Sequence, residues 1–218
     1  MNSPRTTDDL IAQLAASAAP VKRLLPPMTR ALTWLLAIAA ITAIPVMLKS
    51  DLQVWGRRAS DPRMALELIA TLATGVAGVI AAFHLSVPGR SGRWALLPLP
   101  FALVWMSATG VGCWQTLAEQ NHRGWGLFQS SDCFVVLMIA GIPMAGLLLL
   151  SLRRARPLQP RLVAAVGAAG VAGLAAFVLQ FFHPFDVTVM DLGAHLAGLL
   201  VLFAAISLSA RLGLAGEG

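Results

Sequence analysis

Six long apolar segments run through this sequence, and only short polar connections separate them. They cover residues 31–48, 65–87, 94–114, 134–152, 162–182 and 187–209. An α-helix needs about 20 apolar residues to cross a bilayer, and tilt accommodates some variation in length. We therefore predict an all-α integral membrane protein, a bundle of six transmembrane helices.

The composition excludes most classes of soluble protein. Of the 218 residues, 57% are hydrophobic and only 12% are charged, whereas ordinary soluble domains carry about 25% charged residues. Six spans leave no room for a soluble catalytic domain of about 100 residues, which excludes Rossmann, TIM-barrel and P-loop enzymes. No pairing of a nucleophile with a base is visible either, so we expect no enzymatic activity.

The basic residues predict an orientation in the membrane. The net charge of +6 does not indicate direct nucleic-acid binding, because the basic residues form short clusters between apolar segments. One side of a six-span bundle would carry eleven of them, Arg5, Lys22, Arg23, Arg30, Arg90, Arg93, Arg153, Arg154, Arg156, Arg161 and Arg211. The other side would carry Lys49, Arg57, Arg58, Arg63 and Arg123. The positive-inside rule then places both termini in the cytoplasm.

This orientation predicts three parts of the chain. Residues 1–28 form a cytoplasmic leader, residues 29–210 the six-helix transmembrane domain, and residues 211–218 a cytoplasmic tail. The leader has the pattern of one short amphipathic helix. Thr7 can cap its N-terminus, Asp8 and Asp9 favour its first turn through the helix dipole, and Pro20 ends it. Its apolar face consists of Leu10, Ile11, Leu14 and Ala18.

A helix of this length is marginal by itself in water, so its apolar face should dock on another surface. One such surface is the groove of a protein partner. The other is the lipid bilayer, which is less favoured because residues 7–19 contain no Lys or Arg. The candidate partner-binding residues are Asp8, Asp9, Leu10, Ile11 and Leu14.

The two cysteines fall at the predicted outer end of the bundle. Cys113 ends the third apolar segment and Cys133 begins the fourth, with 19 residues between them. In an oxidising periplasm they could form a disulfide, whose loop closure would stabilise the fold by about 3 kcal/mol in the chain-entropy model. They could also stay reduced and bind a soft metal ion, or serve as small buried hydrophobic side chains.

A second polar group accompanies the last predicted outer loop. His183 and Asp186 open that loop, and Asp191 and His195 follow four residues apart, on one face of a helix. Ionisable side chains at membrane depth are costly and are usually paired or functional. Histidine and carboxylate ligands suit a divalent metal ion, and the alternative is a hydrogen-bonded pair that orients the sixth helix. Glu67, near the outer end of the second segment, could join this group.

Small residues recur in two segments at spacings typical of close helix packing. Ala165, Ala169 and Gly173 lie four residues apart in the fifth segment, and Gly75 and Gly78 lie together in the second. We expect these positions to mark contacts between helices.

Several short motifs follow one another in order along the chain. The leader contains Thr7-Asp8-Asp9-Leu10-Ile11, then Pro20-Val21 and Pro26-Pro27. Val87-Pro88-Gly89-Arg90, Trp94 and Pro98 link the second and third segments, and Cys133 begins the fourth. These motifs and the six-span layout resemble the NrsF-like family over nearly the whole chain. That family comprises six-span bacterial inner-membrane anti-sigma factors, named as negative regulators of sigma F.

The resemblance implies that the leader holds an extracytoplasmic-function sigma factor at the membrane and releases it under stress. Some members are linked to heavy-metal or oxidative stress through two outer-face cysteines. Cys133 is the cysteine that the resemblance covers, and with the outer polar residues described above the candidate sensing or metal-binding residues are Cys113, Cys133, His183, Asp186, Asp191 and His195. The chain departs from the family where His183 stands in place of an expected cysteine, which excludes a simple disulfide between Cys133 and the last outer loop.

Two other function classes remain open. A small ion-coupled transporter would use Glu67, Asp191 and His195, but the fourth and fifth segments offer almost no polar residues at the membrane centre. A structural membrane subunit is the other class. We predict an anti-sigma factor whose partners are the sigma factor and the lipid bilayer. A divalent or soft metal ion at the outer face is the one cofactor we consider.

Overall fold

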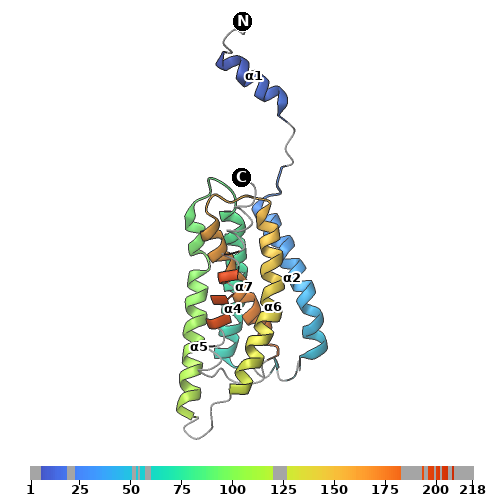
Figure 1. Ribbon diagram of the computed structural model, residues 1–218. Coiled ribbons are helices and arrows are strands. Elements are labelled where there is room, and N and C mark those ends of the chain that lie inside the picture. The colour runs from blue at the N-terminus through green and yellow to red at the C-terminus, as the bar shows by residue number, and fades with distance from the viewer. Residues whose placement is uncertain are drawn as a thin grey trace.

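The computed structural model describes residues 6–18, 23–50, 53, 55–56, 60–119 and 127–182, and then residues 193, 196–198, 200–201, 203–205 and 208. The side chains of residues 116–119 and 127–133 lie outside this description. Within the described residues all regular elements are helices, as Figure 1 shows. The all-α fold is therefore confirmed.

Five long helices form the bundle: α2 (Pro27–Lys49), α4 (Pro62–Leu85), α5 (Leu99–Glu119), α6 (Leu127–Arg153) and α7 (Pro160–Leu179). By length and composition, each of the five is able to cross a membrane. The 3-10 helix η1 (Gly92–Leu96) joins α4 to α5. A shorter apolar helix, Leu196–Ala205, falls within the predicted sixth span. Most of that span lies outside the described residues, so six spans stay a prediction.

Proline and glycine set several helix boundaries. Pro27, Pro62 and Pro160 occupy the first turns of α2, α4 and α7, where the missing N–H costs nothing. The side chain of Asp61 caps α4 by accepting hydrogen bonds from two backbone N–H groups at 2.8 and 3.3 Å. After α4, Gly89 adopts a φ of +80°. Glycine takes this left-handed conformation without steric cost, and the chain turns there into η1.

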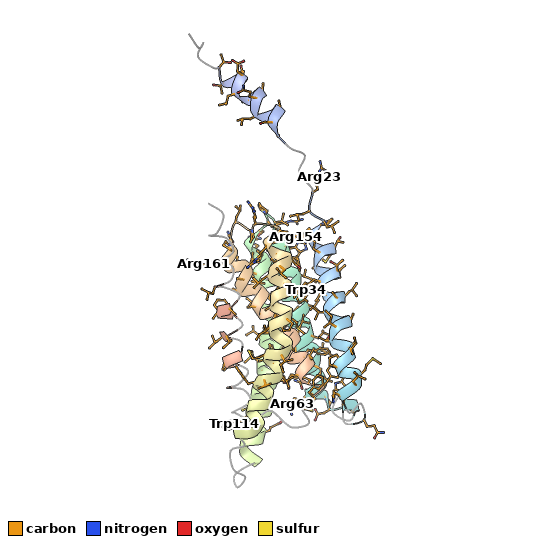
Figure 2. The ribbon with its side chains drawn as sticks, turned by 45° about the vertical axis from the view of Figure 1, so that its right-hand side comes forward. Arg23, Trp34, Arg63, Trp114, Arg154 and Arg161 are labelled. Carbon is orange, nitrogen blue, oxygen red and sulfur yellow. The ribbon has the colours of Figure 1, made fainter. Side chains whose placement is uncertain are left out.

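Consecutive long helices run in opposite directions through the bundle (Figure 1). Helix α4 packs against α2, α5 and α7, and α7 also packs against α6. We call the end at which α2 begins the leader end. Figure 2 places Arg23, Arg154 and Arg161 there, and Arg63 and Trp114 at the opposite end, which we call the far end.

The backbones of helices α4 and α7 are in direct contact. A Cβ atom added to Gly78 would lie 2.6 Å from the Cα of Gly170, and one added to Gly173 would lie 2.7 Å from the backbone nitrogen of Gly75. The prediction of close packing is right at Gly75, Gly78 and Gly173. The other two members of the predicted repeat in α7, both alanines, are only half-buried. Gly170 takes part in the contact instead.

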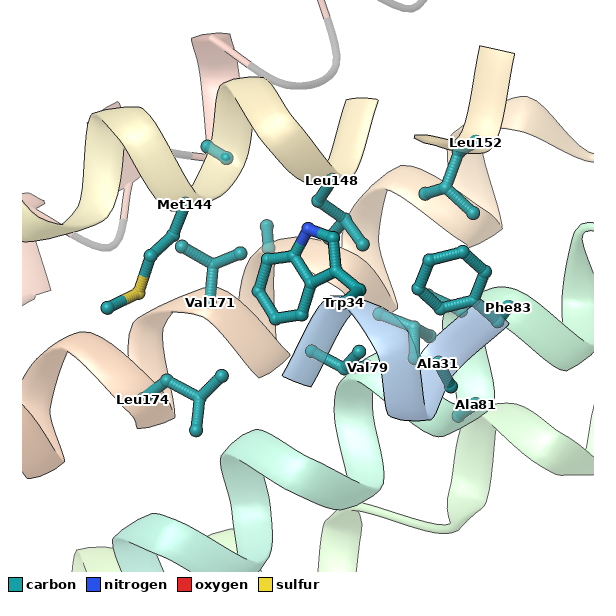
Figure 3. Close-up of a cluster of buried hydrophobic side chains, with 14 of the residues drawn as sticks. Ala31, Trp34, Val79, Ala81, Phe83, Met144, Leu148, Leu152, Val171 and Leu174 are labelled. Carbon is teal, nitrogen blue, oxygen red and sulfur yellow. The ribbon is translucent and has the colours of Figure 1, made fainter. Parts of the chain in front are cut away.

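The apolar core lies towards the leader end. Phe83 of α4, Leu148 of α6 and Val171 of α7 are completely buried, and Trp34 of α2 packs among them (Figure 3). Helix α2 contributes just three buried residues, Ala31, Trp34 and Ile38. It is therefore held to the bundle by one narrow stripe.

The rest of the bundle surface is strongly apolar. Leu36 and Met47 of α2, Leu103 of α5 and Ile139 of α6 are between 68% and 77% exposed. Soluble monomers rarely leave such large apolar areas uncovered. This surface suits contact with lipid.

The leader contains one helix, α1 (Thr7–Ser17), which stands apart from the bundle in Figure 1. All of its residues are exposed. It ends at Ser17, so Ala18, expected on the apolar face of the helix, is instead the C-cap residue with an extended backbone.

Candidate functional site

Helix α1 displays an apolar surface that contacts nothing else in the described chain. Leu10, Ile11 and Leu14 are 48%, 58% and 62% exposed, and none of the helix's residues is buried. The three side chains lie on the same side of the helix, because positions three and four apart are neighbours on a helix surface. An apolar face of this kind is how short helices dock into grooves of other proteins.

The N-terminus of α1 is fixed by a capping box, one residue earlier than we expected. Thr6, and not Thr7, is the N-cap. Its hydroxyl donates to Asp9 Oδ2 at 2.7 Å, its backbone N–H donates to the same oxygen at 3.2 Å, and the Asp9 N–H donates back to the hydroxyl at 3.3 Å. The hydrogen bond from the Thr6 side chain, followed by that from its backbone, lowers the pKa of Asp9 below 3.8.

A buried carboxylate joins three helices at the far end. Glu67 of α4 is only 4% exposed. Its Oε1 accepts hydrogen bonds from Thr109 Oγ1 of α5 at 2.9 Å and from Gln180 Nε2, at the end of α7, at 3.3 Å. Arg63 Nη1 lies 4.0 Å from the other carboxylate oxygen, Oε2. We call Arg63, Glu67, Thr109 and Gln180 the Glu67 cluster.

Cys113 lies next to the Glu67 cluster. It is 6% exposed and follows Thr109 by four residues on α5, so both face the same neighbour. Between them, Gly112 leaves room for the guanidinium of Arg63, which occupies the place that a Cβ atom would take. One predicted sensing residue is therefore built into the contact between α4 and α5.

The other predicted sensing residues are less fully placed. Cys133 belongs to α6, but its side chain lies outside the described residues, and so do His183, Asp186, Asp191 and His195 entirely. The pairing of the two cysteines and the metal site thus stay predictions. Across the part of the chain that the structure describes, no three His, Cys, Asp or Glu side chains are grouped as a metal site requires.

Sequence reasoning missed the partners of Glu67. It noted Glu67 as a member of an outer polar group but named neither Thr109 nor Gln180. The available signal was a polar residue near the same end of each of three apolar segments. It also missed the aromatic group beside Gln180, in which Phe181 stacks on Trp55 with ring centres 5.2 Å apart and meets Phe177 edge-on at 5.4 Å.

At the leader end of the bundle, His84 and Arg30 contact residues of neighbouring helices. His84 is buried at the end of α4 and stacks on Trp94 of η1, with ring centres 3.9 Å apart. Arg30, near the start of α2, donates from Nη2 to the backbone carbonyl of Ser151 on α6 at 2.6 Å. It also lies over the ring of Phe83 at 5.1 Å.

Comparison with known proteins identifies the family. A curated relative, the anti-sigma-F factor NrsF of Caulobacter vibrioides (strain NA1000 / CB15N), is 29% identical over 168 residues, which cover 72% of this chain and 74% of the relative. No solved structure matches the chain. The family described as NrsF, negative regulator of sigma F, matches residues 14–214. This match, which covers most of the chain, shows that the chain belongs to the NrsF family of negative regulators of sigma F.

Proposed function

We propose that this protein is a membrane-bound anti-sigma factor that sequesters an extracytoplasmic-function sigma factor and releases it under periplasmic stress. The observation that carries the proposal is α1, a helix with an uncovered apolar face at the start of a chain from a family of anti-sigma factors. The bundle supplies the membrane anchor, and α1 supplies the docking element.

Docking of α1 would use Leu10, Ile11 and Leu14 as anchors and Asp8 and Asp9 as polar contacts. Burying a Leu or Ile side chain contributes about 1.5–3 kcal/mol. Three anchors that are now about half exposed or more would thus contribute favourably to binding. The docked helix would occlude the surface through which the sigma factor binds polymerase or promoter.

The distribution of charge supports placement in the bacterial inner membrane with both termini in the cytoplasm. Arg23, Arg154 and Arg161 gather at the leader end (Figure 2). Arg90, just before η1, and Arg93, within η1, belong to the connection at that end. Basic residues concentrate on the cytoplasmic side of membrane proteins. A leader on that side would meet a cytoplasmic sigma factor.

We further propose that the far end senses a metal ion or an oxidant through Cys113, Cys133 and the residues His183, Asp186, Asp191 and His195. The Glu67 cluster supports this role because it links α4, α5 and α7 directly beside Cys113. Oxidation or metal binding at Cys113 would therefore alter the contacts among these three helices. The signal must favour one of two arrangements of the bundle over the other in order to act.

Helix α2 is the element that would transmit such a change. It leads directly into the leader, and only three of its residues, Ala31, Trp34 and Ile38, are buried. A helix with few buried contacts is among the least stable parts of a fold. A shift of α2 would change the position of α1 without unfolding the α4–α7 core.

The function is tested by purifying the tagged full chain from solubilised membranes of its native host and identifying the proteins that accompany it. An extracytoplasmic-function sigma factor is expected as the main partner, and its target promoters should become active when the gene for this chain is deleted. Purification without any sigma factor, together with unchanged promoters, would contradict the proposal.

The sensing role is tested by Cys133→Ser and His183→Ala. Each variant should change the response of the target promoters to a metal ion or oxidant, while membrane insertion stays intact. Ser131→Ala, two residues before Cys133, serves as the matched control and should respond like the unaltered chain. A normal response in both variants and in the double variant would leave these residues with a structural role alone.

A further inference from the structure

A groove at the leader end separates the start of α2 from the end of α6. Its volume is about 930 Å³, and Arg23, Arg30 and Arg154 line it together with apolar side chains such as Trp34 and Leu150. Figure 2 shows Arg23 and Arg154 at the leader end and Trp34 further into the bundle. The groove is therefore cationic at its mouth and apolar along its depth.

Two buried hydrogen-bond donors in this groove have no acceptor. Nη2 of Arg30 is used by the Ser151 carbonyl, but Nη1 of Arg30 is buried and has no hydrogen-bond partner among the described residues. The same holds for Nε1 of Trp34, which lies one helical turn, about 6 Å, deeper along α2. Buried donors are nearly always satisfied, so two orphans in one groove indicate a ligand that carries acceptors.

The described residues at this end of the bundle offer the groove no carboxylate. Residues 23–30, 86–98 and 153–161, which lie at this end, contain no Asp or Glu. Arg30 and Arg154 line the same groove, and like charges at such proximity repel each other. The carboxylate of Asp9 is already engaged by the capping box of α1.

We propose that this groove binds the headgroup of an anionic phospholipid. Its phosphate would lie between Arg30 and Arg154, and its acyl chains would continue past Trp34 and over Leu150 to the lipid-facing surface. Basic pockets between transmembrane helices on the cytoplasmic side are suited to such headgroups. A free phosphate ion would leave the apolar depth of the groove unused. The bound lipid would hold the start of α2, directly next to the leader.

This inference rests on the membrane placement in the proposed function and is independent of the sigma factor. It is tested with the detergent-purified full chain, by measuring the binding of dioctanoyl phosphatidylglycerol and dioctanoyl phosphatidylcholine. We expect phosphatidylglycerol to bind at least about tenfold more tightly, because two arginines contact its charge. Arg30→Gln should remove most of that preference. Arg161→Gln deletes the same charge from an exposed position at the same end, outside the groove, and should keep it.

Two further variants keep the test valid if Arg30→Gln fails to fold. Arg154 is exposed and lines the groove, so Arg154→Gln should fold normally and still weaken phosphatidylglycerol binding. Trp34→Phe keeps an aromatic ring in the core but removes the Nε1 donor, and it should weaken binding as well.

Several results would overturn the lipid site. Equal binding of the two lipids would do so, as would equal losses in Arg30→Gln, Arg154→Gln and Arg161→Gln, which would show a diffuse surface charge. Displacement of phosphatidylglycerol by inorganic phosphate would assign the groove to a free anion. If phosphatidylglycerol is preferred only after Asp8 and Asp9 are both changed to Asn, the groove of the unaltered chain is occupied by α1 and not by lipid. Failure of the chain to stay in carbonate-washed membranes would instead contradict the membrane placement.

Discussion

Several buried polar side chains of the bundle have hydrogen-bond partners among the described residues. In the middle of α4, Thr71 and Thr74 are buried, but each hydroxyl donates to a backbone carbonyl one turn earlier in the same helix. Glu67, by contrast, draws its donors from α5 and from the end of α7. Glu67 is the one buried carboxylate among the described residues of the bundle. Its contacts connect three helices.

Replacing Glu67 should therefore loosen the far end. Glu67→Ala leaves the Thr109 hydroxyl and the Gln180 amide without their acceptor, which should lower the free energy of unfolding by about 1 kcal/mol or more. Glu67→Gln keeps an acceptor oxygen of similar reach and should cost less. Thermal unfolding of both variants in detergent measures the difference. Equal midpoints for Glu67→Ala and the unaltered chain would show that the cluster does not stabilise the fold.

The capping box of α1 makes the leader sensitive to acid. Because hydrogen bonds from Thr6 lower the pKa of Asp9 below 3.8, the box stabilises α1 fully above that value, and this support is lost as the pH falls through the lowered pKa. In Thr6→Ala the pKa of Asp9 should return towards 3.8. Carboxyl NMR titration of the two proteins measures this change, and an unchanged pKa would show that the box does not form in solution.

At the scale of helices, the glycine contact between α4 and α7 brings the backbones of two helices together. Gly78→Val should destabilise the bundle by about 1–3 kcal/mol or prevent its assembly, because the new side chain meets the backbone of Gly170, which cannot move aside. Gly146→Val is the matched control, since nothing lies within 4 Å of a Cβ atom there. Size-exclusion chromatography and thermal unfolding in detergent compare the two. Equal behaviour would mean that this contact does not hold the bundle together.

Helices were easier to predict than their contacts. The second apolar segment, predicted at residues 65–87, corresponds to α4 at Pro62–Leu85, because lipid requires a long uninterrupted apolar run and such a run is visible in any sequence. The identity of the N-cap residue of α1 depends on the backbone conformation of a single residue. The sequence alone therefore indicates Thr7, whereas Thr6 is the N-cap in the structure.

The candidate site was predictable only in part for the same reason. The exposed face of α1 follows from helical periodicity, which is a local property. The donors of Glu67 come from residues 42 and 113 positions away along the chain, and the side of each helix that faces its neighbour cannot be deduced when nearly every side is apolar.

For the whole molecule, the direction of insertion determines whether the leader and the sigma factor share a compartment. Reporter fusions after Arg90, after Arg156 and at the C-terminus should all report a cytoplasmic location, because the basic residues favour that side. Fusions after Arg58 and Arg123 should report the periplasm. A periplasmic C-terminus would refute the arrangement of six spans with both termini in the cytoplasm.

The account as a whole depends on α1 as the element that captures the sigma factor. Helix α1 allows a matched comparison, because two aspartates can be added to either of its faces. Leu10→Asp with Leu14→Asp places them on the apolar face, and Ala12→Asp with Ala16→Asp places them on the opposite face of the same helix. The bundle is unchanged in both.

The most direct test is the dissociation constant between the full chain and its sigma factor, measured for these two double variants and the unaltered protein. The change on the apolar face should weaken binding by at least about a hundredfold, because the burial of two leucine side chains is lost. It should also leave the target promoters active without stress. The change on the opposite face should bind and repress nearly as the unaltered chain does. Unaltered binding and repression in the Leu10→Asp, Leu14→Asp variant would show that α1 is not the docking element and that the proposed mechanism is wrong.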